Sequence, residues 1–385
     1  MDRLDRYRQL WQDRSRRRAD YHLFWPGGSY TEDRSILVAG CGTSQAAKYA
    51  VRWPKAKVVG IDFSAKSVQC TEELKTRYDL KNLQVHQLPI EHVNDLGTEF
   101  DQIICTGVLH HLTNPDIGLR ALRNVLKPEG AMHLMVYAPY GRSGIYLLQE
   151  FCRRIDIHAT DKDVQDLATA IRMLPPGHPL ERLLREVSEL RENAAIADAL
   201  LHPNDRAYSV PQLFELVKKE GLVFGRWIRQ APYSSKCGDI SKIPQASRLA
   251  QLPLEEQFAA IELFRGTMVE HSLVLYRNDG PSRRQQVTFS GEAWRGYVPI
   301  RMSETICIQE RLPTGAAAVL INQNHIYRDL VMPIDLVEKR LFDAIDGNSS
   351  IDDIMQKQAC SLDRACSLFE RLSWYDQVVF QTEAE

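Results

Sequence analysis

The sequence predicts an α/β fold in which a doubly wound parallel sheet carries helices on both faces. Between residues 35 and 138, apolar runs of strand length alternate with amphipathic stretches of helix length. The strand runs are almost continuously apolar, which is typical of parallel strands buried on both faces. At roughly 150 residues per domain, a chain of 385 residues also has room for two to three domains.

The first part of the chain supplies an amphipathic helix and then the sheet. Leu4, Tyr7, Leu10 and Trp11 recur at helical spacing, which predicts a helix within residues 1–30. The predicted strands that follow are 36–39, 57–61, 83–86, 100–105 and 131–137, and the predicted helices are 45–52, 64–78 and 116–126. Repeated strand–helix–strand units of this kind form a parallel sheet.

Residues 145–205 interrupt the alternation of strands and helices. Their four helical stretches are 149–155, 161–174, 180–190 and 194–201. Because this is too much structure for a loop, we expect a helical insertion. The earlier pattern resumes with a helix at 210–220, a strand at 223–229, helical residues around 254–264 and a strand at 271–277.

The last hundred residues are predicted to form a separate module. The polar residues 278–284 form the clearest boundary in the chain. Residues 295–331 are rich in strand patterns, and helices are predicted at 335–345, 351–360 and 362–372. We therefore expect a small α+β module at residues 285–385.

Composition excludes several classes of protein. The chain has 48 Lys and Arg residues against 50 Asp and Glu, a net charge of −2, so no basic excess points to nucleic acid. The longest apolar runs are far shorter than the ~20 residues that span a bilayer, and an N-terminus charged from Asp2 is not a secretory signal. The eight cysteines include no Cys-x-x-Cys pair, so we expect a cytoplasmic protein with reduced thiols and no metal centre.

A glycine turn follows the first predicted strand of the sheet. That strand runs into Gly40-Cys41-Gly42, and Asp62 closes the second strand. Glycines let a ligand approach the backbone, and a carboxylate at this place can accept both ribose hydroxyls of an adenosine ligand. A nucleoside triphosphate would need a following Gly-Lys-Ser/Thr, and a dinucleotide would need a small residue where Gln45 stands. S-adenosylmethionine needs only the two glycines and the acid.

Four segments carry further motifs in a fixed order. They are VAGCGT at 38–43, GIDFS at 60–64, FDQIICTGVLHHL at 100–112 and LRNVLKPEG at 122–130. In this order they resemble the class I S-adenosylmethionine-dependent methyltransferases, with weaker similarity over 205–277. The resemblance implies a Rossmann-like methyltransferase domain at 31–280, with residues 145–205 as a lid and S-adenosyl-L-methionine as cofactor. It also places the helix of residues 1–30 over the cofactor site.

The resemblance implies a role for individual residues of the cofactor site. Gly40, Cys41 and Gly42 would lie against the amino-acid part of the cofactor, and Thr106 and Gly107 would flank its methionine chain. Asp62 would hold the ribose. Phe63 would cover one face of adenine, and the Ile90 amide would contact the adenine ring. Two positions depart from the family pattern. Ser44 replaces the usual third glycine, and residues 88–91 lack the acid that binds the adenine amine, for which Gln87 is a candidate substitute.

Methyl transfer needs alignment of the reactants and, for a protonated nucleophile, a base. His110 and His111 directly follow the fourth predicted strand, where such a pair occurs in many small-molecule members of the family. Each is a candidate base or substrate ligand. Tyr140 and Arg142 follow the fifth strand and are candidates to bind a carboxylate or phenolate of the substrate.

His202 is a further candidate base, because it lies where the chain returns from the predicted lid. Asp205 would orient it in a base–carboxylate pair. An N-cap by Asp205 and a buried ion pair would explain the same residue types, and for Tyr140 and Arg142 the structural alternative is a turn cap with a surface guanidinium.

The motif at residues 341–354 resembles the winged-helix peptide-chaperone domains of pyrroloquinoline quinone biosynthesis, which implies a peptide partner for the C-terminal module. A dimerisation or purely structural role stays open, and so does a homodimer.

The resulting expectation is a methyltransferase that acts on an N, O or C nucleophile of a small organic metabolite or a peptide side chain. A non-catalytic scaffold and an RNA methyltransferase are the alternatives. Nucleic acid is the weaker acceptor because only the stretch from Arg3 to Arg18 is basic, and no membrane contact is expected.

Overall fold

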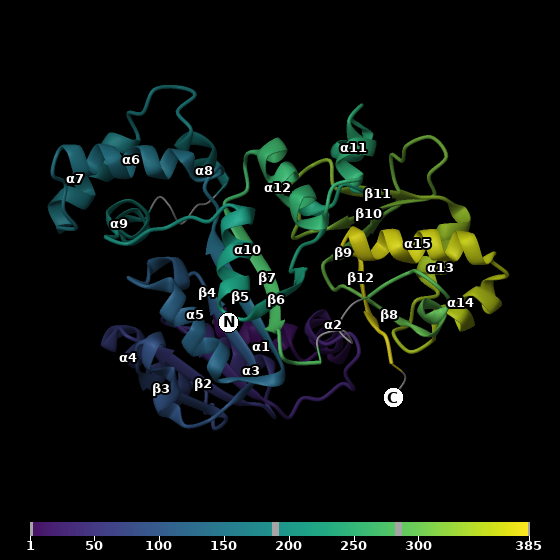
Figure 1. Ribbon diagram of the computed structural model, residues 1–385, viewed down its shortest axis with the longest axis horizontal. Coiled ribbons are helices and arrows are strands. Elements are labelled where there is room, and N and C mark those ends of the chain that lie inside the picture. Colours follow the sequence, from purple (N-terminus) through teal and green to yellow (C-terminus); the bar gives the residue numbers. More distant parts are fainter. Residues whose placement is uncertain (1–2, 187–191, 282–286, 384–385) are drawn as a thin grey trace.

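A computed structural model describes residues 3–186, 192–281 and 287–383, and its centre is a seven-stranded sheet (Figure 1). The strand order is β3-β2-β1-β4-β5-β7-β6. The strands are β1 (Ser35–Ala39), β2 (Lys57–Asp62), β3 (Leu83–Gln87), β4 (Phe100–Thr106), β5 (Leu126–Tyr137), β6 (Leu222–Trp227) and β7 (Glu270–Arg277). The predicted α/β class and doubly wound arrangement are confirmed.

The five strands within residues 35–138 are parallel, as predicted, and one later strand runs in the opposite direction. β7 runs antiparallel to both β5 and β6, whereas β1 to β5 pair in parallel. An antiparallel neighbour needs no crossover to the far edge of a sheet. The chain between β6 and β7 therefore stays at the carboxyl edge of the parallel strands, where the short helix η4 (Ala231–Tyr233) lies.

Helices cover both faces of the sheet. On one face α3 (Gln45–Arg52) packs against alternate side chains of β1 and β2. α4 (Ala65–Arg77) contacts α3, β2 and β3. On the other face lie α5 (Pro115–Asn124), α10 (Val210–Lys219) and α12 (Leu254–Arg265). Because side chains alternate along a strand, the two faces have separate apolar cores.

The N-terminal region forms two helices, α1 (Arg3–Leu10) and α2 (Arg14–Phe24), where the sequence predicted one. The Asp13 carboxylate caps α2 by accepting from the Ser15 and Arg16 amides, which explains the break between the helices. Both helices contact Arg52 at the end of α3. Its guanidinium donates to the Tyr7 hydroxyl (2.6 Å) and pairs with Asp20 (3.3 Å). These contacts lie at the end of α3 away from the glycine turn, so they do not place the helices over the predicted cofactor site.

The predicted helical insertion is present and has a core of its own. Its helices are α6 (Ser143–Arg154), α7 (Asp161–Ile171), α8 (Leu180–Glu186) and α9 (Asn193–Leu201). Ile145, Leu167, Leu180 and Ile196 are among its buried residues. The group projects from the carboxyl edge of the sheet (Figure 1). The end of the predicted helix at 180–190 lies outside the described residues.

The C-terminal module is an α+β unit, as predicted. β9 (Thr305–Ile308), β10 (Ala318–Asn322) and β11 (Val331–Ile334) form one antiparallel sheet, and β12 (Val378–Gln381) pairs with β8 (Val298–Arg301). Its helices are α13 (Leu336–Asp343), α14 (Ile351–Gln358) and α15 (Leu362–Trp374). The module has its own apolar core, although Ile300 and Val379 join the core beneath α3. Residues 282–286, at the predicted boundary, lie outside the described residues.

Within the described ranges, no helix combines the length and apolar character needed to cross a bilayer.

Candidate active site

The glycine turn between β1 and α3 has the shape that a bound ligand requires. Gly40 has a φ of +69°, and a Cβ there would lie 2.3 Å from Cγ2 of Val108, so no larger residue fits. Gly42 has a φ of +53°, but a Cβ there would meet no atom of the described chain within 4 Å. Gly40 is therefore required by packing against Val108, whereas Gly42 faces open space.

Asp62 fixes this turn from the end of β2. Its Oδ2 accepts from the Gly42 amide (2.9 Å) and its Oδ1 accepts from the Ser64 amide (2.9 Å). Each oxygen keeps a second lone pair, so the carboxylate can accept from a ligand as well. Cys41 beside it is buried, and burial raises the pKa of its thiol to about 11. The thiol is therefore neutral, and Cys41 is no nucleophile at neutral pH.

The ring of Phe63 stands next to Asp62 and is 72% exposed, which is unusual for so large an apolar side chain. A flat ligand could therefore stack on it. The Gln87 amide donates to the Phe63 carbonyl oxygen (3.2 Å), so it positions this segment. Ile90 is buried at the start of the short helix η1 (Ile90–Leu96).

The end of β4 completes this side of the site. The Gln45 amide donates to the Thr106 hydroxyl (2.6 Å), and the Gly107 amide donates to the carbonyl oxygen of Met135 on β5 (3.3 Å). Gln45, which argued against a dinucleotide, thus links the start of α3 to β4. The eight predicted cofactor residues come together at the carboxyl ends of β1 to β4.

A cavity of about 430 Å³ opens beside Thr106. Its walls come from the ends of β4, β5 and β7, from the chain after β6, and from the connection between β10 and β11. The lining residues are Thr106, His133, Met135, Ile228, Arg229, Pro232, Tyr233, Met268, Val269, Glu270, Ser272, Asn324, Ile326 and Tyr327. The C-terminal module therefore forms part of the cavity wall.

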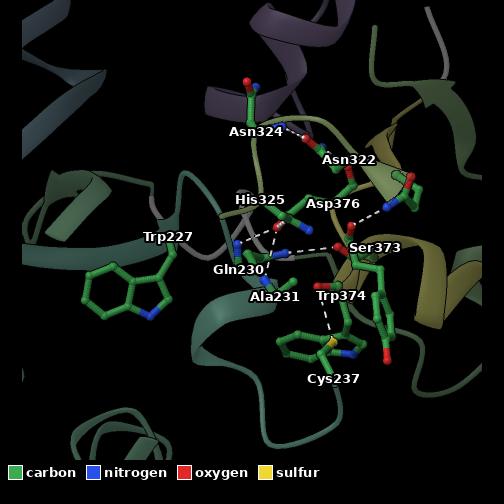
Figure 2. A network of polar contacts seen from close by, with 12 residues as sticks. Trp227, Gln230, Ala231, Cys237, Asn322, Asn324, His325, Ser373, Trp374 and Asp376 are labelled. Atoms are coloured by element: carbon green, nitrogen blue, oxygen red, sulfur yellow. Dashed lines mark hydrogen bonds and ion pairs between the residues drawn. The ribbon is translucent and has the colours of Figure 1, made fainter. Parts of the chain in front are cut away.

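A buried carboxylate attaches the module at this place (Figure 2). Asp376 follows α15 and is 3% exposed. Its Oδ2 accepts from the amides of Gln230 (2.8 Å) and Ala231 (3.0 Å) and lies 3.0 Å from Nε2 of His325. Its Oδ1 pairs with Arg226 (3.3 Å). One side chain of the module thus holds the chain after β6, which lines the cavity.

The same residue also holds the other wall. The Asn322 amide donates to the Asp376 carbonyl oxygen (2.6 Å), and the Asn322 carbonyl accepts from the Asn324 amide (2.9 Å). Asn324 and Ile326 line the cavity, and His325 between them contacts Asp376. The shape of the cavity therefore depends on the docking of the module.

A buried chain of polar groups begins at the cavity wall. The Tyr233 hydroxyl lies 2.7 Å from Nδ1 of His271, whose Nε2 lies 3.0 Å from Oε1 of Glu262. A carboxylate only accepts, so Nε2 carries the proton and Nδ1 accepts from the hydroxyl. His271 and Glu262 are fully buried, and the Val210 amide donates to the second Glu262 oxygen (2.8 Å). This order of groups can take a proton from Tyr233 and stabilise the imidazolium that results.

The predicted His110 and His111 lie in a second polar cluster next to the cavity. The His110 ring lies 3.8 Å from the Tyr137 ring, and His111 lies 4.2 Å from the His202 ring, measured between centroids. Tyr137 is paired in register with Glu270 of the cavity wall. Burial lowers the pKa of His110 to about 2, so its ring is neutral.

Arg142, Asp205 and Tyr140 complete the sequence-predicted set. Arg142 lies 3.5 Å over the Tyr137 ring and pairs with Asp205 (3.2 Å), so its charge is already balanced. Asp205 contacts Arg142 rather than orienting His202, whose Nδ1 accepts from the Asn204 amide (3.1 Å). Tyr140 is 40% exposed and does not contribute to the cavity lining. Four of the five predicted catalytic residues are therefore gathered in one cluster.

The cavity residues Tyr233 and Glu270, and the buried His271 and Glu262 behind them, were missed by the sequence analysis. They come from three separate elements, and no spacing along the chain connects them. The only available signal was a Glu-His pair at the start of the predicted strand 271–277, which is also what a surface strand end would show.

Comparison with known proteins relates the chain to methyltransferases by sequence and by fold. Residues 31–171 match the family described as methyltransferase domain. An uncharacterized protein of Synechococcus sp. is 34% identical over 197 residues, which are 49% of this chain and 47% of that protein. Two structures of PKMT2 from Rickettsia typhi, one in complex with AdoHcy, align with 96% of this chain and 75% of that chain, at TM-scores of 0.65 and 0.64 and identities of 15% and 14%. The chain spans less than half the length of the curated relatives it matches, and the likeness to PKMT2 shows a shared fold.

Proposed function

We propose that this chain, which carries a class I S-adenosylmethionine-dependent methyltransferase domain at residues 31–171, transfers a methyl group to an N or O nucleophile of a small organic metabolite or a peptide side chain. The observation that carries the proposal is the junction at Thr106. Thr106 lines a cavity of about 430 Å³, and its hydroxyl accepts from Gln45 of α3, the helix that follows the turn fixed by Asp62. Cofactor and acceptor would lie on either side of this residue.

The residues present fit S-adenosylmethionine. Gly42 borders open space for the amino-acid part, the Asp62 carboxylate is oriented to accept from ribose hydroxyls, and Phe63 offers an exposed ring to adenine. Thr106 and Gly107 would flank the methionine chain. When bound, this cofactor supplies a methyl group on a sulfonium, which is the electrophile of the reaction.

The acceptor would enter the cavity between the sheet and the C-terminal module. Its wall combines apolar side chains with two of opposite charge, Arg229 and Glu270. Such a mixture orients a polar acceptor group and excludes bulk water from the rest of the space. The chain's contribution to the rate would be alignment of the nucleophile with the methyl group.

A protonated nucleophile must lose its proton, and we assign this step to Tyr233, His271 and Glu262. Tyr233 would accept the proton of the acceptor while passing its own to Nδ1 of His271. Glu262, 3.0 Å from Nε2, would stabilise the imidazolium. His110 is a poorer base, because a ring with a pKa of about 2 does not hold a proton at neutral pH.

We place this activity in the cytoplasm, because all eight cysteines are free thiols.

Calorimetry with S-adenosylhomocysteine tests the cofactor half of the proposal. Wild type should bind it. Asp62→Ala should weaken binding by about 100-fold, because the two expected hydrogen bonds from the ribose hydroxyls to the charged Asp62 carboxylate are lost. Asp101→Asn is the matched control. This carboxylate accepts from the Ser35 amide (2.7 Å) at the opposite end of the sheet, so its loss should leave the affinity unchanged. Tight binding of a dinucleotide instead would refute the cofactor assignment.

A labelled-methyl screen tests the acceptor half. Cell lysate is divided into metabolite, peptide and RNA fractions, and each is incubated with the protein and the labelled cofactor. Label in the first or second fraction supports the proposal and selects between them. Label in RNA alone would contradict it, and binding of the cofactor with no transfer to any fraction would indicate a scaffold.

A further inference from the structure

We propose that His110, His111 and Asp205 bind a divalent transition-metal ion of the zinc class. One possible ligand atom from each of the three residues lies within 4.8 Å of the others. The proposal rests on this geometry and does not require the methyl transfer proposed above. It also departs from the sequence, whose cysteine pattern indicated no metal centre.

The three residues come from two segments that are already joined. His110 and His111 belong to η2 (Leu109–His111), directly after β4, and Asp205 lies between α9 and α10. The Arg206 amide donates to the His110 carbonyl oxygen (3.1 Å), so the backbone holds the two segments together without an ion. A site preformed in this way needs little rearrangement to bind a metal.

The His110 ring is the strongest indication that this cluster binds a ligand. Its side chain is fully buried, yet neither ring nitrogen has a hydrogen-bond partner within the described residues. Burying an unpaired polar group costs free energy, and native structures almost always provide a partner. A bound ion would supply one.

His111 has the orientation of a typical metal ligand. Its Nδ1 lies 2.8 Å from the Asn204 carbonyl oxygen, to which it can only donate. The proton is therefore on Nδ1, and the lone pair of Nε2 is free to bind an ion. Metal-binding histidines commonly donate their other ring nitrogen to a carbonyl or carboxylate in this way.

Asp205 has one oxygen fixed and one free. Oδ2 accepts from Gln149 (2.7 Å) and pairs with Arg142 (3.2 Å), which fixes the plane of the carboxylate. Oδ1 is buried and has no partner among the residues that the structure describes. Binding through Oδ1 would leave the Arg142 contact intact.

The ligand types select the class of metal. Two imidazole nitrogens and one carboxylate oxygen suit zinc, cobalt, nickel or iron, whereas magnesium and calcium prefer oxygen ligands alone. Three protein ligands leave at least one position open.

Cobalt is the direct probe, because Co²⁺ absorbs visible light when it is bound by nitrogen and oxygen ligands in a distorted site. Full-length protein is treated with a chelator, dialysed and titrated with Co²⁺, and then with Zn²⁺ in competition. We expect one Co²⁺ per chain, displaced by Zn²⁺, and a higher unfolding temperature with either ion.

Two conservative variants identify the ligands. His110→Phe keeps a ring against Tyr137, and Asp205→Asn can still accept from Arg142 and Gln149, so both should fold and bind S-adenosylhomocysteine. Since removal of a supporting residue alone costs about 10–100-fold in metal affinity, loss of a ligand should cost more than about 100-fold. His92→Ala is the control, because His92 and Asp95 form a similar pair (3.7 Å) on the surface.

Three results would overturn the metal site. They are no bound Co²⁺ in wild type, equal binding by wild type and both variants, and loss of binding in His92→Ala. Failure of the methyltransferase proposal would appear elsewhere, as a lack of S-adenosylhomocysteine binding.

Discussion

The two halves of the candidate active site are built by different means. The cofactor half is made of backbone turns at the ends of consecutive strands, and Asp62 fixes its glycine turn through two amide hydrogen bonds. The acceptor half is made of side chains from β5, β7, the chain after β6 and a connection in the C-terminal module. The first is local in sequence, and the second exists only when distant parts of the chain dock.

This difference has a practical meaning. Changes in the docking contacts should alter the acceptor half and spare the cofactor half, whereas changes in the turns should do the reverse. S-adenosylhomocysteine affinity reports on the first region, and methyl transfer and stability report on the second. The following variants test how far the two halves are independent.

Removal of the docking carboxylate should have the largest effect. Asp376→Ala leaves Arg226 and His325 without their partner, and it places alanine at a φ of +53°. We expect a loss of about 3–5 kcal/mol in the free energy of unfolding, measured with urea, because breaking a buried ion pair leaves an uncompensated charge.

A surface pair provides the control for Asp376. Asp279→Ala removes a half-exposed carboxylate that also has two arginine partners, and it should cost about 0–1 kcal/mol. If Asp376→Ala lowered S-adenosylhomocysteine affinity as much as it lowered methyl transfer at a temperature where it is folded, the two halves would not be independent.

The two turn glycines should separate folding from binding. Gly40→Ala forces a Cβ against Val108 at 2.3 Å and should destabilise the fold by about 2–4 kcal/mol, from overpacking and the left-handed backbone. Gly42→Ala meets open space, so it should cost only about 1 kcal/mol in stability. Its Cβ would nevertheless occupy the place of the cofactor.

Thermal unfolding and calorimetry distinguish the two glycine variants. We expect S-adenosylhomocysteine binding to be lost in Gly42→Ala although the protein remains nearly as stable as wild type. Unchanged affinity in that variant would mean that the cofactor does not lie against this turn.

The Tyr233 hydroxyl should matter for transfer alone. Tyr233→Phe keeps the ring stacked on Trp227 at 3.9 Å and removes the group that contacts His271. With the acceptor fraction found in the screen, we expect transfer to slow by about 100-fold, which is the lower range for loss of a general base. The pH profile of the remaining rate should also change, and S-adenosylhomocysteine affinity should not.

Tyr327→Phe is the matched control for the relay, because Tyr327 also lines the cavity and its hydroxyl accepts from the Thr267 hydroxyl (3.3 Å). A similar loss of rate in both variants would indicate that cavity shape, rather than proton transfer, determines the rate.

The pH dependence of stability tests the wall of the acceptor half directly. His133 lines the cavity, and burial lowers its pKa to about 3, against about 6.5 in the unfolded chain. Between these values the unfolded state binds the additional proton, so stability falls as the pH falls. His133→Gln should reduce this slope by about 1.4 kcal/mol per pH unit in urea unfolding between about pH 4 and 6.

At pH 7 and above the ring is neutral in both states, so wild type and His133→Gln should then differ by a constant amount. An equal slope for both proteins below pH 6 would contradict the assignment of a buried neutral ring.

The sequence predicted the parts of the site that are formed by the backbone of one short segment. The glycine turn and Asp62 could be anticipated because each is encoded in a short segment with a strict steric requirement, as the contact of Gly40 with Val108 shows. The antiparallel direction of β7 could not, because a buried strand reads as the same apolar run in either direction.

The acceptor half could not be predicted for a related reason. Tyr233, His271 and Asp376 serve the site only through contacts over long sequence separations. His110 was recognised as a functional candidate, but its role as a base depended on burial, which a sequence motif does not report.

The alternation of side chains along β7 sets a route for protons. Glu270 and Ser272 line the cavity, whereas His271 between them contacts Glu262 of α12 on the other side of the strand. Both His271 and Glu262 are sealed from solvent, so a proton that reaches them can leave only through Tyr233. In the proposed reaction, each turnover would therefore store one proton in the interior until the methylated product departs. Loss of the stored proton from His271 and release of the methylated product from the cavity would then occur together.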